Sequence, residues 1–269
     1  MNRARALRII SLCVVGLLWQ AGDLRASAFT VTPVRVLLGQ GAKSALLTVR
    51  NDSTEPLRFQ ISLKAWNQAA NGEMQLSDTK DLVFFPRLME LKAGEERPVR
   101  VGSAFKAPVI TERTYRIFFE ELPPANVPQT QQSGAQVRVL TRMGVPIFVQ
   151  PPNPVVKGEL GGVSVAGGKL SFDVRNVGNS FFTVTGATVT GVSKDGATTF
   201  QKKQDGWYVL AGGRRKFDFD IPSEACQKTD RIKIEVASSL VDEKGSPNLL
   251  TREMNVGGSA CNVTRTASR

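Results

Sequence analysis

The 269-residue chain contains no histidine. Histidine is the general base of Ser-His-Asp and Cys-His hydrolases and the commonest protein ligand of metal ions, so its absence argues against both kinds of site. A hydrolase could still use two carboxylates about 5 to 9.5 Å apart. The adjacent Glu120 and Glu121 are a poor pair, because neighbouring side chains on a strand point to opposite faces. The sequence therefore predicts no catalytic residues, no metal site and no cofactor.

Cysteine is scarce as well, with three residues in the whole chain. Cys13 lies in an N-terminal segment that we expect to be removed, which leaves the even pair Cys226 and Cys261. Two thiols without histidine make a poor zinc site, because structural zinc generally takes four Cys or His ligands. In an oxidising compartment an even pair favours a disulfide, and we predict one between Cys226 and Cys261.

Long apolar runs are missing after the N-terminus. There, arginines precede an apolar run over residues 9–19, and Ala26-Ser27-Ala28 follows. The run is shorter than the roughly 20 residues of a membrane-spanning helix. The order of charged, apolar and small residues is typical of a secretory signal peptide. We predict a signal over residues 1–28, cleavage after Ala28, and a soluble mature chain outside the cytoplasm without stable membrane insertion.

Acidic residues are outnumbered, at 24 Asp and Glu against 35 Lys and Arg, which gives a formal net charge of +11. Such an excess favours acidic partners, anionic membrane surfaces or nucleic acid. The basic residues are scattered rather than clustered, as on an ordinary solvated surface. Because a secretion signal also argues against nucleic acid, we predict no nucleic-acid partner.

Sustained helical periodicity is missing too. Alternating apolar residues recur instead in short runs separated by turns, for example over residues 57–65, 115–119, 170–174 and 232–236. This period of two is the pattern of strands with one buried face. We therefore predict an all-β fold of antiparallel sandwiches.

The cluster Pro151-Pro152-Asn153-Pro154 predicts a short, stiff linker, because proline fixes φ and cannot donate to a β ladder. We accordingly predict a first domain over residues 29–151 and a second over residues 152–269. Residues 125–135 are polar and lack periodicity, which favours a flexible loop. This loop leads into the longest predicted strand, residues 136–149.

That long strand is the candidate interaction element. Val137, Val139, Thr141 and Met143 share one of its faces. In an arbitrary strand such residues would be ordinary core. A long strand after a flexible loop, in a protein without catalytic residues, also suits an edge that lends alternate side chains to a partner chain. We predict these four residues as a donor strand, with core packing as the alternative.

Several motifs resemble the PapD-like periplasmic pilus chaperones. In the first half they are Phe85-Pro86-Arg87-Leu88, Val49-Arg50-Asn51-Asp52 and the segment from Glu112 to Phe119, and in the second half Asn176-Val177-Gly178-Asn179. The resemblance implies two immunoglobulin-like β-sandwich domains in an L-shaped arrangement. It also implies a periplasmic chaperone without enzymatic activity, whose partners are pilus subunits and an outer-membrane usher.

In that family a basic pair anchors the C-terminal carboxylate of a subunit, while the last strand of the first domain completes the subunit's fold. Arg35 matches the family's first-strand arginine. The usual second basic residue, a lysine, falls here on Pro146. The spacing of Arg142, Pro146 and Phe148 resembles the archaic clade of the family. We predict that Arg142 or Arg116 supplies the second cation of the pair, since two cations hold a carboxylate better than one.

Two other functions compete with the chaperone interpretation. The same sandwiches could belong to a secreted adhesin or binding module that presents its loops to a carbohydrate or a host protein. Sparse aromatic residues outside the predicted cores weigh against a sugar-binding platform. A periplasmic hydrolase would need two acids at hydrolytic spacing in one cleft, with the pKa of one of them raised.

Overall fold

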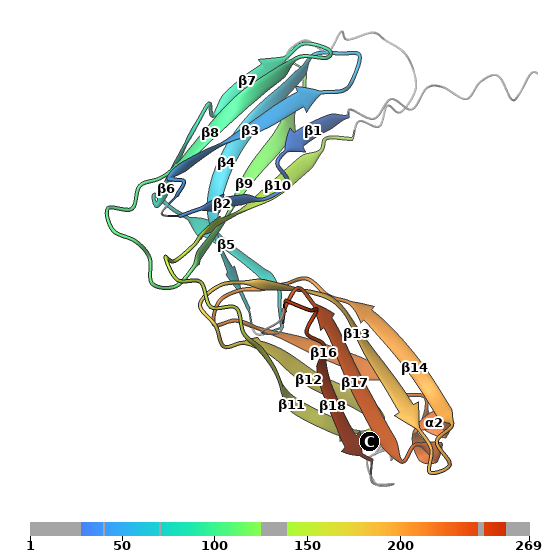
Figure 1. Cartoon of the computed structure of the whole chain (residues 1–269). Helices are drawn as coiled ribbons and strands as arrows, with labels where there is room; N and C mark the ends of the chain where they lie inside the picture. Colours follow the sequence, from blue (N-terminus) through green and yellow to red (C-terminus); the bar gives the residue numbers. More distant parts are fainter. Residues whose placement is uncertain (1–27, 40, 70, 125–138, 242–244, 257–269) are drawn as a thin grey trace, which may run out of the picture.

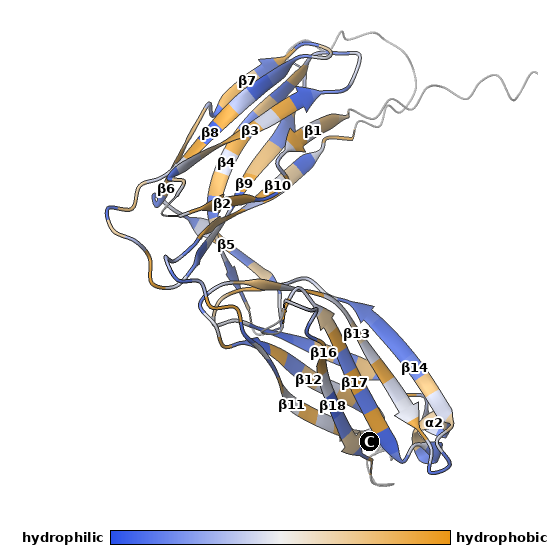
Figure 2. Cartoon of the chain, viewed as in Figure 1, coloured by the Kyte–Doolittle hydropathy of each residue, from blue (hydrophilic) through white to orange (hydrophobic). Residues whose placement is uncertain are grey.

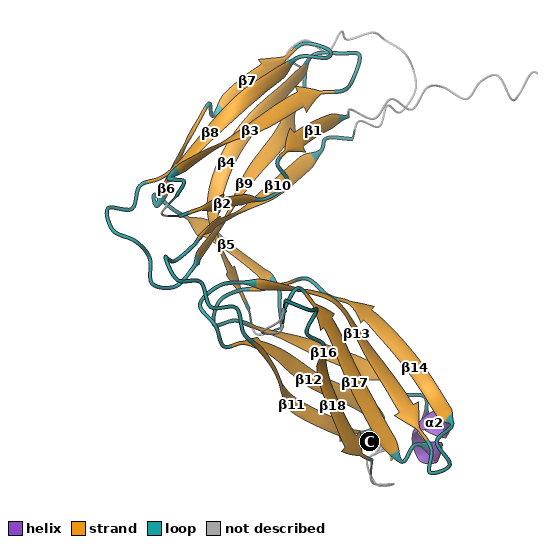
Figure 3. Cartoon of the chain, in the orientation of Figure 1, coloured by secondary structure: helices purple, strands orange, loops and turns teal. Residues whose placement is uncertain are grey.

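The computed structural model describes residues 28–39, 41–69, 71–124, 139–241 and 245–256. Two elongated lobes, each built of strands, are joined at an angle (Figure 1). The described ranges contain one helix, the short α2 (Ser223–Lys228) (Figure 3). No helix among these residues is long and apolar enough to cross a membrane. The all-β prediction is confirmed; residues 1–27 of the predicted signal peptide and the 125–135 loop lie outside the described residues.

The first lobe consists of two sheets packed face to face. One has the strand order β1-β3-β8-β6, and the other has the order β2-β10-β9-β4-β5, with β7 paired to β4. The strands are β1 (Phe29–Thr32), β2 (Val36–Leu38), β3 (Ser44–Asn51), β4 (Leu57–Gln68), β5 (Met74–Asp78), β6 (Leu82–Phe85), β7 (Leu88–Leu91), β8 (Glu96–Ser103), β9 (Arg113–Leu122) and β10 (Arg142–Val149).

The second lobe is also a sandwich of two sheets. Their orders are β11-β12-β16 and β14-β13-β17-β18, with β15 paired to β13. The strands are β11 (Gly158–Ala166), β12 (Lys169–Asn176), β13 (Phe182–Val192), β14 (Thr198–Asp205), β15 (Tyr208–Val209), β16 (Arg214–Asp220), β17 (Arg231–Ser238) and β18 (Leu250–Asn255). We propose the segment between β10 and β11, residues 150–157, as the junction of the two domains.

The alternating residues supply the two cores. Along β9, Tyr115, Ile117 and Phe119 are buried against the facing sheet of the first lobe. Phe172 of β12 and Phe217 of β16 are buried in the second lobe, where their rings stack. Polar residues occupy the positions between them, so the strands are banded in hydropathy (Figure 2). Because apolar burial dominates folding energetics, this alternation fixes which face of each strand points inward.

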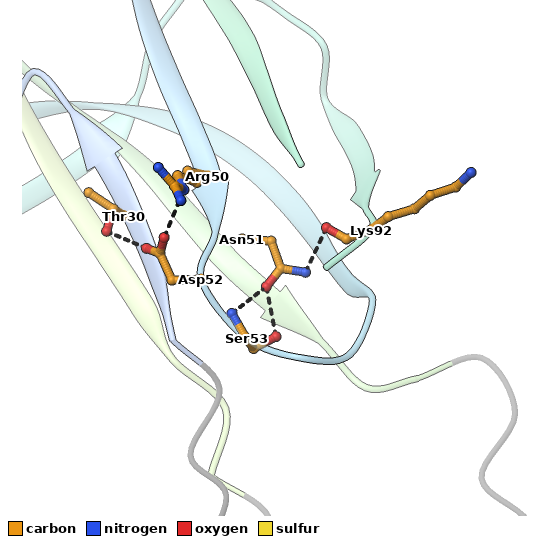
Figure 4. Close-up of polar contacts among 6 residues, drawn as sticks. All are labelled: Thr30, Arg50, Asn51, Asp52, Ser53 and Lys92. Atoms are coloured by element: carbon orange, nitrogen blue, oxygen red, sulfur yellow. Dashed lines mark hydrogen bonds and ion pairs between the residues drawn. The ribbon is translucent and has the colours of Figure 1, made fainter. Parts of the chain in front are cut away.

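Each lobe has a buried asparagine at the end of a strand. Asn51 ends β3 and is fully buried; its Nδ2 donates to the backbone oxygens of Leu91 and Lys92, both at 3.1 Å, while its Oδ1 accepts from Ser53 (Figure 4). Asn176 ends β12 and donates in the same way to backbone oxygens of Ser180 and Val209, at 2.8 and 3.0 Å. A buried side-chain amide whose hydrogen bonds are satisfied links a turn to the neighbouring strand.

The predicted end of the long strand at Val149 is confirmed, but its predicted start at residue 136 is wrong. We expected a strand over residues 136–149, whereas β10 begins at Arg142 and residues 139–141 are not in a strand. The reason lies in the partner strand. β9 ends at Leu122, and Pro123 and Pro124 follow, which have no N–H to donate. Thr141 keeps one ladder bond, in which its carbonyl oxygen accepts from the N–H of Glu121 at 3.0 Å.

The predicted disulfide can be tested by thiol counting and by denaturation. Cys226 in α2 is buried and disulfide-bonded, while Cys261 lies outside the described residues, so the pairing stays a prediction. Closing a loop of about 35 residues stabilises a domain by about 2 to 4 kcal/mol. We expect the free energy of unfolding, measured in urea, to fall by this amount when both cysteines are replaced by alanine. Two free thiols in the oxidised, denatured protein would contradict the pairing.

Candidate functional site: a free strand edge beside two arginines

Part of β10 has no neighbour on one side among the described strands. In the sheet order β2-β10-β9, the strand β9 pairs with the whole length of β10. On the other side, β2 pairs only with Ile147–Val149, in parallel. Over residues 142–146, therefore, no described strand covers this edge of β10. A row of unpaired backbone groups at a sheet edge is a template for pairing with another chain.

Two hydrogen bonds establish which backbone groups of β10 face outward. The N–H of Glu121 in β9 donates to the oxygen of Thr141, and the N–H of Gln150 donates to the oxygen of Leu38 in β2. Odd-numbered residues of this segment therefore bond toward β9, and even-numbered residues bond away from it. The outward N–H groups of the free edge belong to Arg142 and Gly144. Pro146, the next outward residue, has no N–H, which suits a position at an edge.

The four predicted donor residues fall into different environments. Val139 is 64% exposed and lies just before β10. Thr141 is exposed as well. Met143, in contrast, is partly buried and packs against the core of the first lobe, because it shares the inward face of β10 with Val145. Val137 lies outside the described residues. Met143 thus fits the core alternative, and Val139 has the exposure that donation requires.

Arg35 lies at the point where the free edge of β10 stops. It directly precedes β2, whose first residue, Val36, pairs with Ile147. Its side chain is exposed and makes no ion pair with a described acidic side chain. The guanidinium carbon Cζ lies 5.6 Å from the centre of the Phe181 ring, within the range of a cation–π contact. Arg35 is therefore a cation held at the edge by an aromatic ring.

The ring under Arg35 belongs to an aromatic cluster that joins the two lobes. Trp66 and Phe148 come from the first lobe, and Phe181, Trp207 and Tyr208 come from the second. Phe181 stacks on Phe148 with 3.9 Å between ring centroids. Sequence patterns missed this cluster, because we expected few aromatic residues outside the predicted cores. A ring pair contributed by two domains leaves no periodic signal in either strand.

Arg116 lies on the same side of the sheet as the aromatic cluster. It pairs in register with Pro146, and its Cζ lies 4.8 Å from the ring of Trp66 and 5.1 Å from that of Trp207. Burial lowers the pKa of its guanidinium, whose Nε is buried with no hydrogen-bond partner among the described atoms. A Cβ at Gly144 would lie 3.5 Å from Nη1 of Arg116. The guanidinium therefore extends over β10 toward the free edge.

Arg142 is placed differently from the other two arginines. Its Nε lies 3.6 Å from Oε2 of Glu120, and its Cζ lies 4.1 Å from the centre of the Phe118 ring. Its charge is thus already balanced at the start of β10. Of the two substitute anchors that we predicted, Arg116 is the one without an acidic partner in the described structure.

The described residues contain no group of three or more His, Cys, Asp or Glu side chains that could hold a metal ion. What the site does present is a backbone edge, one exposed cation and one half-buried cation beside an aromatic cluster. An edge binds an extended chain through ladder hydrogen bonds, and the cations attract a carboxylate. Fold and site together define a protein of two β-sandwich lobes, with an uncovered strand edge beside two arginines.

The N-terminal part of the sequence is similar to known chaperone sequences. Residues 28–154 match the family described as "Pili and flagellar-assembly chaperone, PapD N-terminal domain". A curated relative, the "Probable fimbrial chaperone EcpE" of Escherichia coli O18:K1:H7, is 24% identical over 166 residues, which are 61% of this chain and 64% of the relative. The N-terminal part of the chain is therefore similar to the PapD-like pilus and flagellar-assembly chaperones.

Solved structures show the same fold. The chaperone–tip adhesion subunit complex CsuC–CsuE, from archaic chaperone–usher pili of Acinetobacter baumannii, matches at a TM-score of 0.59 and 19% identity, over 84% of this chain and 97% of that one. The Salmonella enterica SafA pilin in complex with the SafB chaperone matches at a TM-score of 0.52 and 15% identity, over 86% and 99%. These likenesses confirm the two-domain, immunoglobulin-like architecture.

Proposed function

We propose that this protein is a periplasmic chaperone that captures pilus subunits by donor-strand complementation and delivers them to an outer-membrane usher. One observation carries the proposal: the uncovered edge of β10, residues 142–146, runs directly to the exposed cation of Arg35. The match of residues 28–154 to the chaperone family supports it. The proposed role is to bind a protein chain and release it unchanged, which needs no catalytic residue.

The geometry of β2 indicates the direction of the bound strand. β2 runs parallel to β10 and begins immediately after Arg35. A subunit strand that pairs with the free edge in the same parallel sense would run from the level of Arg142 toward Pro146 and end beside Arg35. Its C-terminal carboxylate would then meet the guanidinium. An antiparallel strand would bring a positively charged N-terminus to the same place, where like charges repel.

Arg116 is the second cation in this proposal. It approaches the edge from the face of the sheet, whereas Arg35 stands at the end of the edge. The aromatic contacts hold both guanidinium groups, so little side-chain freedom remains to be lost on binding. Two fixed cations can share one carboxylate through charge-assisted hydrogen bonds.

Val139 and Thr141 extend the donor segment upstream of β10. We propose that Val137, Val139 and Thr141 are presented to a groove in the subunit. The exposure of Val139 supports this role. We also propose the archaic clade, which the spacing of Arg142, Pro146 and Phe148 favours, and export through the predicted signal peptide.

Two substitutions at one residue separate edge pairing from the charge of Arg142. The binding partner for these tests is a pilus subunit sought among the genes beside this one. Arg142→Ala removes a cation that is already paired with Glu120, so binding of that subunit should change by less than about threefold. Arg142→Pro also removes an outward N–H, and one lost hydrogen bond should weaken binding by about tenfold. Affinity is measured by calorimetry, with melting temperature as the folding control.

Proline is tolerated at the first residue of a strand, so both variants are expected to fold. Equal affinity for the alanine and proline variants would show that the N–H of Arg142 does not pair with the subunit. A large loss in Arg142→Ala would instead make Arg142 an anchor and displace Arg116 from that role.

A further inference from the structure

Glu112 connects the two lobes through Phe181, the residue that Arg35 also contacts. It directly precedes β9 and is 7% exposed. Its carboxylate Oε1 accepts from the N–H of Phe181 at 3.0 Å, and its own N–H donates to the oxygen of Asn179 at 2.9 Å. One residue of the first lobe thus holds both ends of the segment that leads into β13 in the second lobe.

This bond and the Arg35 contact involve the same residue, Phe181. Its N–H is held by Glu112, while its ring stacks on Phe148 and lies under the guanidinium of Arg35. A shift of the Phe181 backbone would therefore move the ring on which Arg35 rests. No other described hydrogen bond from a first-lobe side chain reaches Phe181.

The Glu112 carboxyl group is buried without a balancing charge. Its Oε2 has no hydrogen-bond partner among the described atoms, and burial raises its pKa to about 7 although the bond from Phe181 opposes the rise. The neighbouring cations are engaged elsewhere: Arg113 lies 3.9 Å from Asp81, and Lys157 lies 3.6 Å from Glu159. The guanidinium carbon of Arg35 lies over the Phe181 ring, 5.6 Å from its centre.

We propose that Glu112 is a positioning residue for the Arg35 anchor, which it controls by fixing Phe181, and that its protonation couples the geometry of the junction to pH. An ionised carboxylate accepts a hydrogen bond more strongly than a neutral one. Deprotonation of Glu112 therefore strengthens its hydrogen bond from the Phe181 N–H, and protonation weakens this bond. The part that concerns subunit capture rests on the proposed function, whereas the coupling of Glu112 to the junction does not.

The chain offers a clear spectroscopic test. Apart from Trp19 in the predicted signal peptide, its tryptophans are Trp66 and Trp207, and both lie in the aromatic cluster. There is no histidine to titrate near neutral pH. A pH titration of tryptophan emission therefore reports on the junction, with Glu112 as the described group whose pKa lies in that range.

We expect the emission of the mature wild-type protein to change with a midpoint near pH 7, and that of Glu112→Gln to stay constant from pH 5.5 to 8.5. Glutamine keeps an acceptor for the Phe181 N–H but does not ionise. Glu121→Gln is the matched control, because Glu121 is also buried but lies at the other end of β9. It should keep the midpoint. A wild-type curve without a midpoint, or a midpoint that persists in Glu112→Gln, would overturn the coupling.

Subunit capture provides the second readout. At pH 7.5, Glu112→Ala should bind the pilus subunit encoded beside this gene about tenfold more weakly, since it loses the bond to Phe181, whereas Glu112→Gln should bind within about threefold of wild type. Equal affinity of the alanine variant and wild type would overturn the positioning role. If the wild-type protein binds no subunit, the proposed function fails, and the fluorescence titration still decides the coupling.

Discussion

Replacing Arg35 by alanine is expected to weaken capture of a pilus subunit by about 30-fold or more while leaving the protein folded. Arg35 is exposed and contacts the Phe181 ring, so folding loses one cation–π contact worth about 0.5 to 1 kcal/mol. In the complex, the terminal carboxylate of the subunit would keep Arg116 but lose the cation at the end of the free edge. Truncating one member of such a pair costs about 2 to 5 kcal/mol, which weakens binding by about 30-fold or more.

The comparison uses subunit affinity and melting temperature for three proteins: wild type, Arg35→Ala and Arg100→Ala. Arg100 is an exposed arginine on β8, in the other sheet of the first lobe, and its replacement should affect neither quantity. Affinity at the wild-type level in Arg35→Ala would show that the anchor lies elsewhere.

The second large effect is expected at Val139. Because its side chain is 64% exposed, Val139→Asp should change the free energy of unfolding by less than about 0.5 kcal/mol. If this side chain enters a groove in the subunit, a carboxylate would be buried there without a partner. That cost is at least several kcal/mol and should weaken binding by more than about 100-fold.

Leu140 supplies the control for Val139. It is also exposed, but in an extended segment its side chain points to the opposite face. Leu140→Asp should therefore weaken binding far less than Val139→Asp. Equal losses from the two variants would argue against insertion of alternate side chains, and a collapsed melting temperature of Val139→Asp would show that Val139 belongs to the core.

Local patterns predicted the fold well because burial in a sandwich follows the period of two. Tyr115, Ile117 and Phe119 were recognisable as an inward face before their partner strands were known. Glu120 and Glu121 likewise point to opposite faces, one exposed and one buried. The start of β10 was not predictable in the same way, since it depends on where β9 ends rather than on the alternation of residues 136–141.

The site was predictable only in part, because it forms between distant segments. The position of Arg35 was expected, and Pro146 marked the edge of the strand. The choice between Arg116 and Arg142 depended on Glu120, which lies opposite Arg142 in the paired strand and balances its charge. Glu112 appeared in a motif, but its contact with Phe181 crosses the two lobes, and sequence spacing carries no record of it.

Amide hydrogen exchange at β10 tests the central claim, strand addition at the free edge, most directly. In the free protein the N–H groups of Arg142 and Gly144 face outward and should exchange quickly, whereas those of Met143 and Val145 face β9 and should be protected. Binding of the pilus subunit encoded beside this gene should slow exchange at Arg142 and Gly144 by about 100-fold or more. Unchanged exchange at both amides in a saturated complex would contradict strand addition at this edge.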